Sequence, residues 1–306
     1  MKYFLILIFV FLAVLGFFWQ GIFLPLDSQK EKNFLVKKGD SLGQIAENLE
    51  KEGFIKKDYF FRIYAMASKK SSLARAGEYE LSSAMNVPEI LAKLTSGDRI
   101  KRQITLIEGW NVGQVKNYLQ TQGMENLDIL DGLEGYLFPD TYEIFPEDGL
   151  EGLLDKINLN FESKLTLKMS QDMEMEGRNL TQIITMASLI EKEVKTLEDK
   201  KIVSGILWKR IKAGMPLQVD AAIVYITGKN STAITKEELQ IDSPFNTYKY
   251  KGLPPSPICS PGLDSILAAI YPEDSDYWFY LSTPAGETIF SRNYEEHRSA
   301  IENYLK

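Results

Sequence analysis

Residues 180–196 read LTQIITMASLIEKEVKT, and their spacing predicts a helix with one apolar side. At about 100° per residue, the apolar residues of this segment fall on a single stripe of the helix surface. They are Leu180, Ile183, Ile184, Ala187, Ile190 and Val194. Glu191 lies within the stripe, about 40° from Ala187, and Glu193 lies about 120° away on the other side. The helix therefore gives its two acids different predicted environments.

These environments have different chemical consequences. We expect Glu193 to lie on the solvated face, whereas Glu191 must either find a charged partner or enter an apolar pocket that raises its pKa. A raised carboxyl pKa is what a general acid needs at neutral pH. The alternative is an ion pair with Lys195, four residues on. Helix geometry alone favours this ion pair, because structural ion pairs are commoner than catalytic acids.

The composition limits the chemistry that the chain can perform. Its 306 residues are 44% hydrophobic and 25% charged, so the chain can bury one large core or two smaller ones. A net charge of −7 would repel a phosphate backbone, which argues against nucleic acid as a partner. The single cysteine and the single histidine, Cys259 and His297, exclude an intrachain disulfide and clustered cysteine or histidine metal sites. We therefore expect no metal and no cofactor.

The first 26 residues predict a membrane anchor. Residues 3–26 carry no charge and include FLILIFVFLAVLGFFW, which is long enough to cross a bilayer core of about 30 Å as a helix. A cleaved signal peptide is the alternative, but its apolar region is only about 7–15 residues long and ends at a small-residue cleavage site. The sequence holds no second comparable span. We expect a single-pass protein whose orientation the few flanking lysines do not decide.

A small α+β domain is predicted at residues 33–100, after a linker at 27–32. It opens with FLVKKGDSLGQIAENLEKEGFI, residues 34–55, in which an extended stretch, a Gly-Asp turn and a helix capped by Ser41 follow one another. A second helix at residues 57–67 and a strand followed by a helix capped by Asn86 complete the unit. The first half of this unit resembles a LysM module, which binds wall glycan, although a fold resemblance does not by itself carry a binding site.

The remaining residues, 101–306, predict a mixed α+β domain with helices of unequal length rather than a regular doubly wound sheet. A strand-like segment at 99–109 precedes a helix at 111–122 with Val112, Val115 and Leu119 on its apolar side. We expect one long amphipathic helix at 153–170 and a break at 177–179. The complete fold class is thus α+β, with one N-terminal transmembrane helix, a LysM-like domain and this larger domain.

Two segments are dense in turn-forming and polar residues. EGYLFPDTY, residues 134–142, combines a glycine and a proline with aromatic side chains, which is a surface that suits carbohydrate. SPFNTYKYKGLPPSPICSPG, residues 243–262, has five prolines and two glycines, and the aromatic and aliphatic residues between them favour burial. We therefore expect the second segment to be an ordered wall rather than a polyproline spacer.

The order of these motifs resembles the YceG-like (MltG) endolytic murein transglycosylases. The resemblance rests on ASLIEKE, GMPLQVD with Tyr225 downstream, SPFNTY, GLPPSPI, SPGLDS, EGYLFPDTY and the terminal FSRNYEEH, and it covers essentially the whole chain. It implies cleavage of the MurNAc–GlcNAc β-1,4 bond within nascent peptidoglycan strands, leaving 1,6-anhydro-MurNAc ends. It also implies a plasma (inner) membrane protein whose catalytic domain lies outside the cytoplasm, and peptidoglycan synthases as candidate partners.

The resemblance assigns the catalytic acid to the first glutamate of its motif, which falls on Glu191. A transglycosylase can work with one such acid, because the C6 hydroxyl of MurNAc replaces water as the nucleophile. The resemblance also implies substrate-binding residues in the cleft. These are Gln218, Asp220, Ser243, Asn246, Thr247 and Tyr248, with Glu134 and Tyr136 lining it.

Other interpretations stay open at the level of sequence. The chain could be a non-catalytic, membrane-anchored scaffold that binds the wall, or a glycoside hydrolase in which Glu134 or Asp220 is a second carboxylate beside Glu191. Asp220 could also be only the N-cap of a helix at residues 221–226. A lone histidine such as His297 near a C-terminal helix is more often structural than catalytic.

Overall fold

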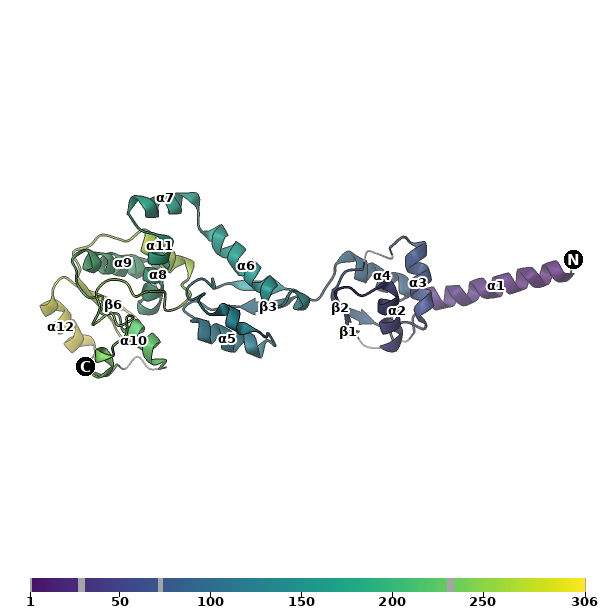
Figure 1. The fold of residues 1–306 in the computed structure, drawn as a ribbon, viewed down its shortest axis with the longest axis horizontal. Helices are drawn as coiled ribbons and strands as arrows, with labels where there is room; N and C mark the ends of the chain where they lie inside the picture. Colours follow the sequence, from purple (N-terminus) through teal and green to yellow (C-terminus); the bar gives the residue numbers. More distant parts are fainter. Residues whose placement is uncertain (1, 27–30, 71–73, 230–233, 306) are drawn as a thin grey trace. The chain divides into compact units, whose positions relative to one another are not determined.

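A computed structural model describes residues 2–26, 31–70, 74–229 and 234–305 of the chain (Figure 1). The elements in the first 149 residues are α1 (Lys2–Phe23), β1 (Glu31–Val36), α2 (Leu42–Lys51), α3 (Asp58–Ala67), β2 (Gly77–Ser82), α4 (Val87–Ser96), β3 (Arg102–Thr105), α5 (Val112–Thr121), η1 (Leu127–Leu130), β4 (Thr141–Ile144) and η2 (Pro146–Asp148). Those that follow are α6 (Gly149–Lys164), α7 (Leu167–Met175), α8 (Leu180–Glu193), α9 (Leu197–Lys212), α10 (Asp220–Thr227), η3 (Glu238–Gln240), α11 (Leu263–Ile270), β5 (Phe279–Ser282), β6 (Thr288–Ser291) and α12 (Tyr294–Tyr304).

The chain divides into two compact units. The N-terminal unit comprises residues 1–103 and 143–149, and the C-terminal unit comprises residues 104–142 and 150–306. The chain passes from one unit to the other within β3 and returns within β4. Most of the linker predicted at 27–32 lies outside the described residues, and its last two residues begin β1.

The N-terminal unit is built on one antiparallel pair of strands. β1 pairs with β2 in a register that places Phe34 opposite Tyr79, and alternate residues of both strands point into the core. The helices α2, α3 and α4 supply most of the rest of this core, together with Ile22 of α1 and with Phe54 and Ile55 after α2. The predicted caps are confirmed, because Ser41 accepts the backbone N–H of Gln44 and Asn86 accepts that of Glu89.

The C-terminal unit is built around α8. Every residue from 183 to 190 is buried, and α8 packs against α9 and α11. A helix that is buried on all sides is a core element rather than a surface helix, and this differs from the one-sided helix that the sequence predicts. The reason is that α9, α11 and the loop before α11 all pack against α8, and the buried Ser188 hydroxyl accepts the N–H of Ile258 in this loop.

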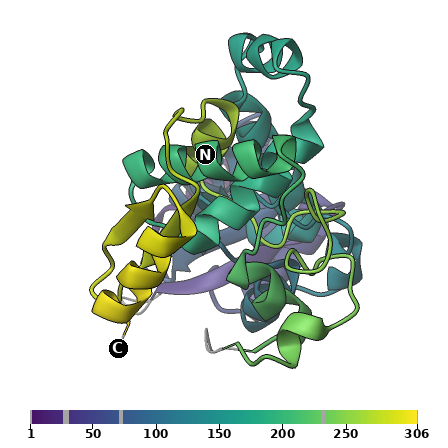
Figure 2. The same ribbon diagram turned by 90° about the vertical axis from the view of Figure 1, so that its left-hand side faces the viewer.

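The α+β class is confirmed, but the larger unit contains less sheet than expected. The described residues form three two-stranded sheets, β1–β2, β3–β4 and β5–β6, and no larger one. The hairpin of β5 and β6 packs with α12 at the C-terminal end of the chain (Figure 2, yellow). His297 of α12 stacks on Phe279 of β5 with 5.2 Å between the ring centroids, which is a packing role.

One predicted helix is two in the structure. The segment expected to be continuous from 153 to 170 is divided into α6, which ends at Lys164, and α7, which begins at Leu167. Thr166 separates them because its extended backbone and its side chain, which accepts the N–H of Met169, cap a new helix. The predicted break near 177–179 is confirmed, with Gly177 at a positive φ of 67°.

Candidate active site

The helix α8 ends at Glu193, three residues before the predicted end. Val194 has an extended backbone with φ −143° and ψ 159°, so the helix cannot continue to residue 196. Lys195 therefore lies beyond the helix, and the predicted i, i+4 ion pair between Glu191 and Lys195 does not form. This early end also changes the environment of both acids.

Glu191 is held by groups from two other helices and the loop between them. Its Oε2 atom lies 3.3 Å from Nζ of Lys200 in α9 and accepts hydrogen bonds from the Ser265 hydroxyl at 2.5 Å and the Gly262 N–H at 3.1 Å. The side chains of Glu191 and Lys200 are only 9% and 5% exposed. The partner predicted for Glu191 thus exists, but it comes from α9. The pair ties α8, α9 and α11 together inside the C-terminal unit.

Glu193 is not the solvated residue that the helical projection predicts. The side chain is half-buried, and burial raises its pKa to about 7. The negative charge of Asp220 raises the pKa further, whereas Tyr280, the N–H of Ala221 and the positive charge of Arg210 lower it. The expectation failed because α10 and the β5–β6 hairpin pack around the end of α8, which a projection of one helix cannot include. A carboxyl with this pKa is protonated in about half of the molecules at neutral pH.

Asp220 and Tyr248 form a polar pair beside Glu193. The Tyr248 hydroxyl donates a short hydrogen bond to Oδ1 of Asp220, and burial together with this carboxylate raises the pKa of Tyr248 well above its usual value. Asp220 is the first residue of α10, and the N-cap is Val219, which has no side-chain bond. The N-cap alternative for Asp220 is therefore wrong. Its carboxylate instead interacts with the Tyr248 hydroxyl and with Glu193.

Gln218 precedes this pair in an unusual backbone conformation. It is exposed and has a φ of 53°, one of three non-glycine residues with positive φ among the described residues. Such a conformation costs about 1 kcal/mol or more and persists only where the surroundings hold it. Here the backbone N–H of Gln218 donates to the Thr247 carbonyl at 3.0 Å. The structure thus joins the segment of Gln218 and Asp220 to the loop that carries Tyr248, and Asp220 lies near Glu193.

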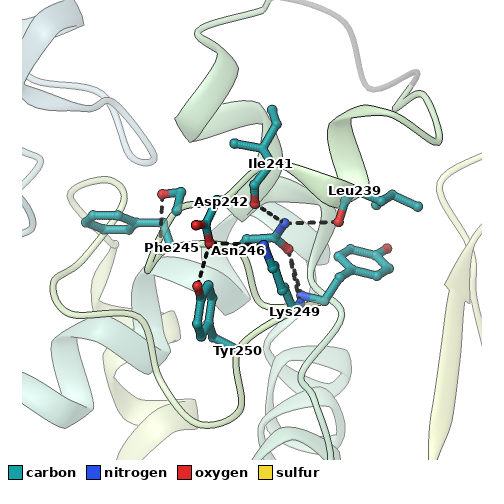
Figure 3. Close-up of polar contacts among 9 residues, drawn as sticks. Leu239, Ile241, Asp242, Phe245, Asn246, Lys249 and Tyr250 are labelled. Atoms are coloured by element: carbon teal, nitrogen blue, oxygen red, sulfur yellow. Dashed lines mark hydrogen bonds and ion pairs between the residues drawn. The ribbon is translucent and has the colours of Figure 1, made fainter.

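Two of the predicted binding residues hold the loop itself. Asn246 is fully buried, donates to the carbonyls of Leu239 and Ile241, and accepts the N–H groups of Tyr248 and Lys249 (Figure 3). Its amide has no free group for a sugar. Ser243 has a similar local role, because its side chain accepts the N–H of Phe245.

Thr247 joins the loop to the segment that carries Gln218 and Asp220. Its buried hydroxyl accepts the N–H of Val219 at 2.9 Å and donates to the Val219 carbonyl at 3.2 Å. Asn246 and Thr247 thus fix the loop of residues 243–250 through buried hydrogen bonds.

Thr247→Val is expected to destabilise the protein by about 1–3 kcal/mol, because it leaves the buried N–H of Val219 without an acceptor while the side-chain volume is kept. Chemical unfolding followed by circular dichroism measures this change. The control is Thr227→Val, since the Thr227 hydroxyl bonds only to carbonyls of its own helix. Equal effects of both substitutions would contradict the role given to Thr247.

Glu134 is another carboxyl of the C-terminal unit with a raised pKa. Burial raises the pKa of Glu134 to about 7, although its oxygens accept the N–H of Val112 at 3.1 and 3.2 Å and the Tyr225 hydroxyl at 3.5 Å. Glu134 therefore caps the first turn of α5. Tyr136, two residues later, donates to the hydroxyl of Thr181 at 3.3 Å. Besides burial, Glu191 and Glu134, which the sequence pairs in the hydrolase alternative, both raise the pKa of the buried Cys259 thiol and so lie around it.

Sequence reasoning missed the environment of Glu193, to which Tyr280 and Arg210 contribute. Glu193 was visible in the motif ASLIEKE, but the projection assigned it to solvent. Nothing in the local sequence marks Tyr280 or Arg210, since they reach Glu193 from a hairpin and from α9. Among the described residues, no group of three or more histidine, cysteine, aspartate or glutamate side chains could hold a metal ion.

Comparison with known proteins identifies the family of the chain. A model of the YceG-like family matches residues 34–303. The chain belongs to the YceG-like family. It is 32% identical to an endolytic murein transglycosylase of Bacillus subtilis (strain 168), over 91% of this chain and 86% of the relative. It is 31% identical to one of Streptococcus pneumoniae (strain ATCC BAA-255 / R6), over 99% of this chain but 65% of that longer protein.

A solved structure also resembles this member of the YceG-like family. A crystal structure of a yceG-like protein from Listeria monocytogenes aligns with a TM-score of 0.60 and 28% identity. The alignment covers 89% of this chain and 99% of the Listeria chain. The likeness thus extends over nearly the whole fold of that protein.

Proposed function

We propose that this chain is a membrane-anchored endolytic lytic transglycosylase that cleaves MurNAc–GlcNAc β-1,4 bonds in peptidoglycan and leaves 1,6-anhydro-MurNAc ends. Membership of the YceG-like family and the similarity to two endolytic murein transglycosylases support the reaction class. The observation that carries the proposal is a half-buried carboxyl with a pKa of about 7, Glu193, beside the polar pair of Asp220 and Tyr248.

The geometry favours Glu193 over Glu191 as the general acid. Oε2 of Glu191 already interacts with the Lys200 ammonium group, the Ser265 hydroxyl and the Gly262 N–H. Glu193 has the pKa that proton transfer in both directions requires near neutral pH. In this proposal Glu191 positions the end of α8. The alternative is that Glu191 is the acid, as the family resemblance implies.

The proposed reaction needs one carboxyl group. The protonated Glu193 donates its proton to the glycosidic oxygen while the bond from that oxygen to C1 of MurNAc breaks. The resulting carboxylate then accepts the proton of the MurNAc C6 hydroxyl, whose oxygen forms the new bond to C1. This intramolecular attack has a large effective molarity compared with water. No water is consumed, and Glu193 returns to its protonated form.

The predicted binding residues have proposed roles in holding the strand. Gln218 and Tyr248 would orient sugar or peptide groups from the exposed side of the site, and Glu134 and Tyr136 would line the cleft. Asn246, Thr247 and Ser243 would act indirectly, by fixing the loop that carries Tyr248. The LysM-like character of the N-terminal unit, with glycan binding by it, belongs to the same proposal and rests on the strand, turn and helix at β1 and α2.

Product analysis tests the proposal. Digestion of purified peptidoglycan strands by the full chain in detergent should give ends that are lighter by one water than reducing ends, and borohydride should not reduce them. Mass spectrometry with and without borohydride measures this. Predominantly reducible ends would instead indicate a two-carboxylate hydrolase. A chain that cleaves no wall substrate would support the scaffold interpretation.

Asp220→Asn is expected to shift the activity profile to lower pH. The negative charge of Asp220 raises the pKa of Glu193, so its removal lowers that pKa and leaves less protonated acid at pH 7. The asparagine side chain can still accept the Tyr248 hydrogen bond. We expect a severalfold loss of kcat/KM at neutral pH and a falling limb at more acidic pH, measured from kcat/KM against pH. An unchanged limb would show that Asp220 does not act on the acid.

Membrane anchoring by α1 is part of the proposal. α1 is a 22-residue apolar helix near the N-terminus, and it is the only helix among the described residues that is long and apolar enough to cross a bilayer. We propose that it holds the chain in the plasma membrane with both units on the extracytoplasmic side, where peptidoglycan lies and where peptidoglycan synthases would be partners. Protease treatment of spheroplasts should digest the chain from outside. Recovery of a shortened soluble form would instead indicate a cleaved signal peptide.

A further inference from the structure

The helix α3 of the N-terminal unit has an apolar outer side. Its inner residues Phe60 and Phe61 belong to the core of the unit. Tyr59, Ile63 and Met66, spaced by four and three residues, lie together on the other side and are 36%, 40% and 55% exposed. Three large apolar side chains in a row on a ten-residue helix are an amphipathic pattern that is turned outward.

This helix packs alongside the C-terminal part of α1. The rings of Phe17 and Phe18 lie 5.4 and 5.7 Å from that of Phe60, measured between centroids. Gly21 allows this approach, because a Cβ atom there would lie 2.2 Å from the Phe60 ring. Lys56 adds a hydrogen bond of 3.1 Å from its ammonium group to the carbonyl of Gln20. The last two turns of α1 are therefore fixed against α3.

The length of α1 sets the depth of α3. A bilayer core of about 30 Å needs roughly 20 helical residues. The part of α1 between Tyr3 and Gly16, before the contacts with α3 begin, is about 21 Å long at 1.5 Å per residue. This part is roughly 9 Å too short to span the core, so residues 17–22 must complete the span. Since α3 lies beside those residues, it must lie at the boundary of the bilayer.

Basic residues flank the apolar side of α3 at both ends. Lys56 and Lys57 precede the helix, and Lys69 and Lys70 follow it. Arg62 lies between them and is exposed. Of these, Lys57 and Arg62 have acidic partners, Glu50 and Asp58. An apolar row between clusters of cations is the pattern of helices that lie in the interface of membranes with anionic lipids.

We infer that α3 is an interfacial membrane helix, with Tyr59, Ile63 and Met66 in contact with lipid and the flanking lysines at the headgroups. The inference rests on the proposed anchoring by α1 and extends it. The N-terminal unit would then lie against the bilayer surface rather than be attached to it through α1 alone. The apolar side of α3 would contact the lipid interface next to α1. A unit held by two elements has a fixed face toward the membrane.

Fluorescence quenching by lipid tests this inference in the full chain. The variants Ile63→Cys and Met66→Cys are labelled with an environment-sensitive fluorophore and reconstituted into vesicles of phosphatidylcholine and phosphatidylglycerol that contain a nitroxide lipid. The matched control is Leu35→Cys, since Leu35 is 48% exposed on β1 but points away from the core that α3 covers. The wild-type chain is the labelling blank, because its only cysteine, Cys259, is buried. Val10→Cys in α1 reports on the anchor.

Each outcome decides the inference. We expect labels at positions 63 and 66 to be quenched at least about twofold more strongly than at position 35, with emission shifted to shorter wavelength. Quenching at position 10 together with values at 63 and 66 that equal the value at 35 would overturn the inference and leave the anchor intact. No quenching at position 10 would overturn both. Circular dichroism of each variant excludes a loss of fold as the cause.

Discussion

Glu193→Gln is expected to abolish turnover while the protein stays folded. The amide has nearly the shape of the carboxyl group but cannot donate a proton and then accept one, and general acid–base catalysis typically contributes about 10²–10⁴-fold. We expect kcat/KM on peptidoglycan strands to fall by this factor at all pH values. Release of anhydro-ended fragments, followed by mass spectrometry, measures the change. An active Glu193→Gln variant would show that Glu193 is not the general acid and would favour Glu191 in that role.

The stability of the same variant gives an independent check. The pKa of Glu193 is about 7 in the folded chain and lower in the unfolded chain, so the folded state binds its proton more tightly. The stability that this proton contributes is complete below the unfolded pKa and is lost as the pH rises through 7. Replacement by the neutral amide removes this loss. We expect the variant to unfold at a similar or higher temperature than the wild type at pH 8, and a marked decrease would show that the ionised carboxylate is paired.

Local signals in the sequence predicted much of the fold. The caps at Ser41 and Asn86, the apolar positions of α5 and the break before α8 follow from turn chemistry and periodicity within a few residues, and these predictions are confirmed. The capping threonine between α6 and α7 was also readable, but its signal was weaker than the amphipathic pattern around it. A few neighbouring residues determine each of these features, which is why the sequence alone could predict them.

The site could be predicted only as a set of segments. The sequence indicated that 134–142, 187–193, 214–220 and 243–262 carry the chemistry, but not how their side chains meet. The fate of Glu191 and Glu193 depends on Lys200, Tyr280 and residues of α10, which come from outside the helix that carries both acids. A helical projection treats the surroundings as one apolar side and one wet side. In the C-terminal unit the side opposite the predicted core is also covered, and the projection gave Glu193 the wrong environment.

Glu191→Gln is expected to destabilise the C-terminal unit strongly. The substitution removes the carboxylate that forms an ion pair with the ammonium group of Lys200, whose side chain is 5% exposed. Loss of one member of a buried ion pair typically costs about 3–5 kcal/mol, because the remaining charge stays buried without compensation. The hydrogen bonds from Ser265 and Gly262 would also lose the carboxyl oxygen that accepts them. Chemical unfolding of the full chain should show a clearly lower midpoint for this variant.

The double variant Glu191→Gln, Lys200→Met separates a structural role of Glu191 from a catalytic one. Removing both charges and filling the space with an apolar side chain should recover much of the lost stability, since a buried pair and an apolar replacement often have similar free energies. If Glu191 only positions the end of α8, activity should recover together with the folded fraction, because Glu193 is still present to transfer the proton. If Glu191 is the acid, the refolded double variant stays inactive by about 10²-fold or more. The measurement is kcat/KM per folded molecule, with Glu193→Gln as the inactive reference. Recovery of activity in this double variant, which lacks Glu191 and keeps Glu193, would show that Glu193 transfers the proton.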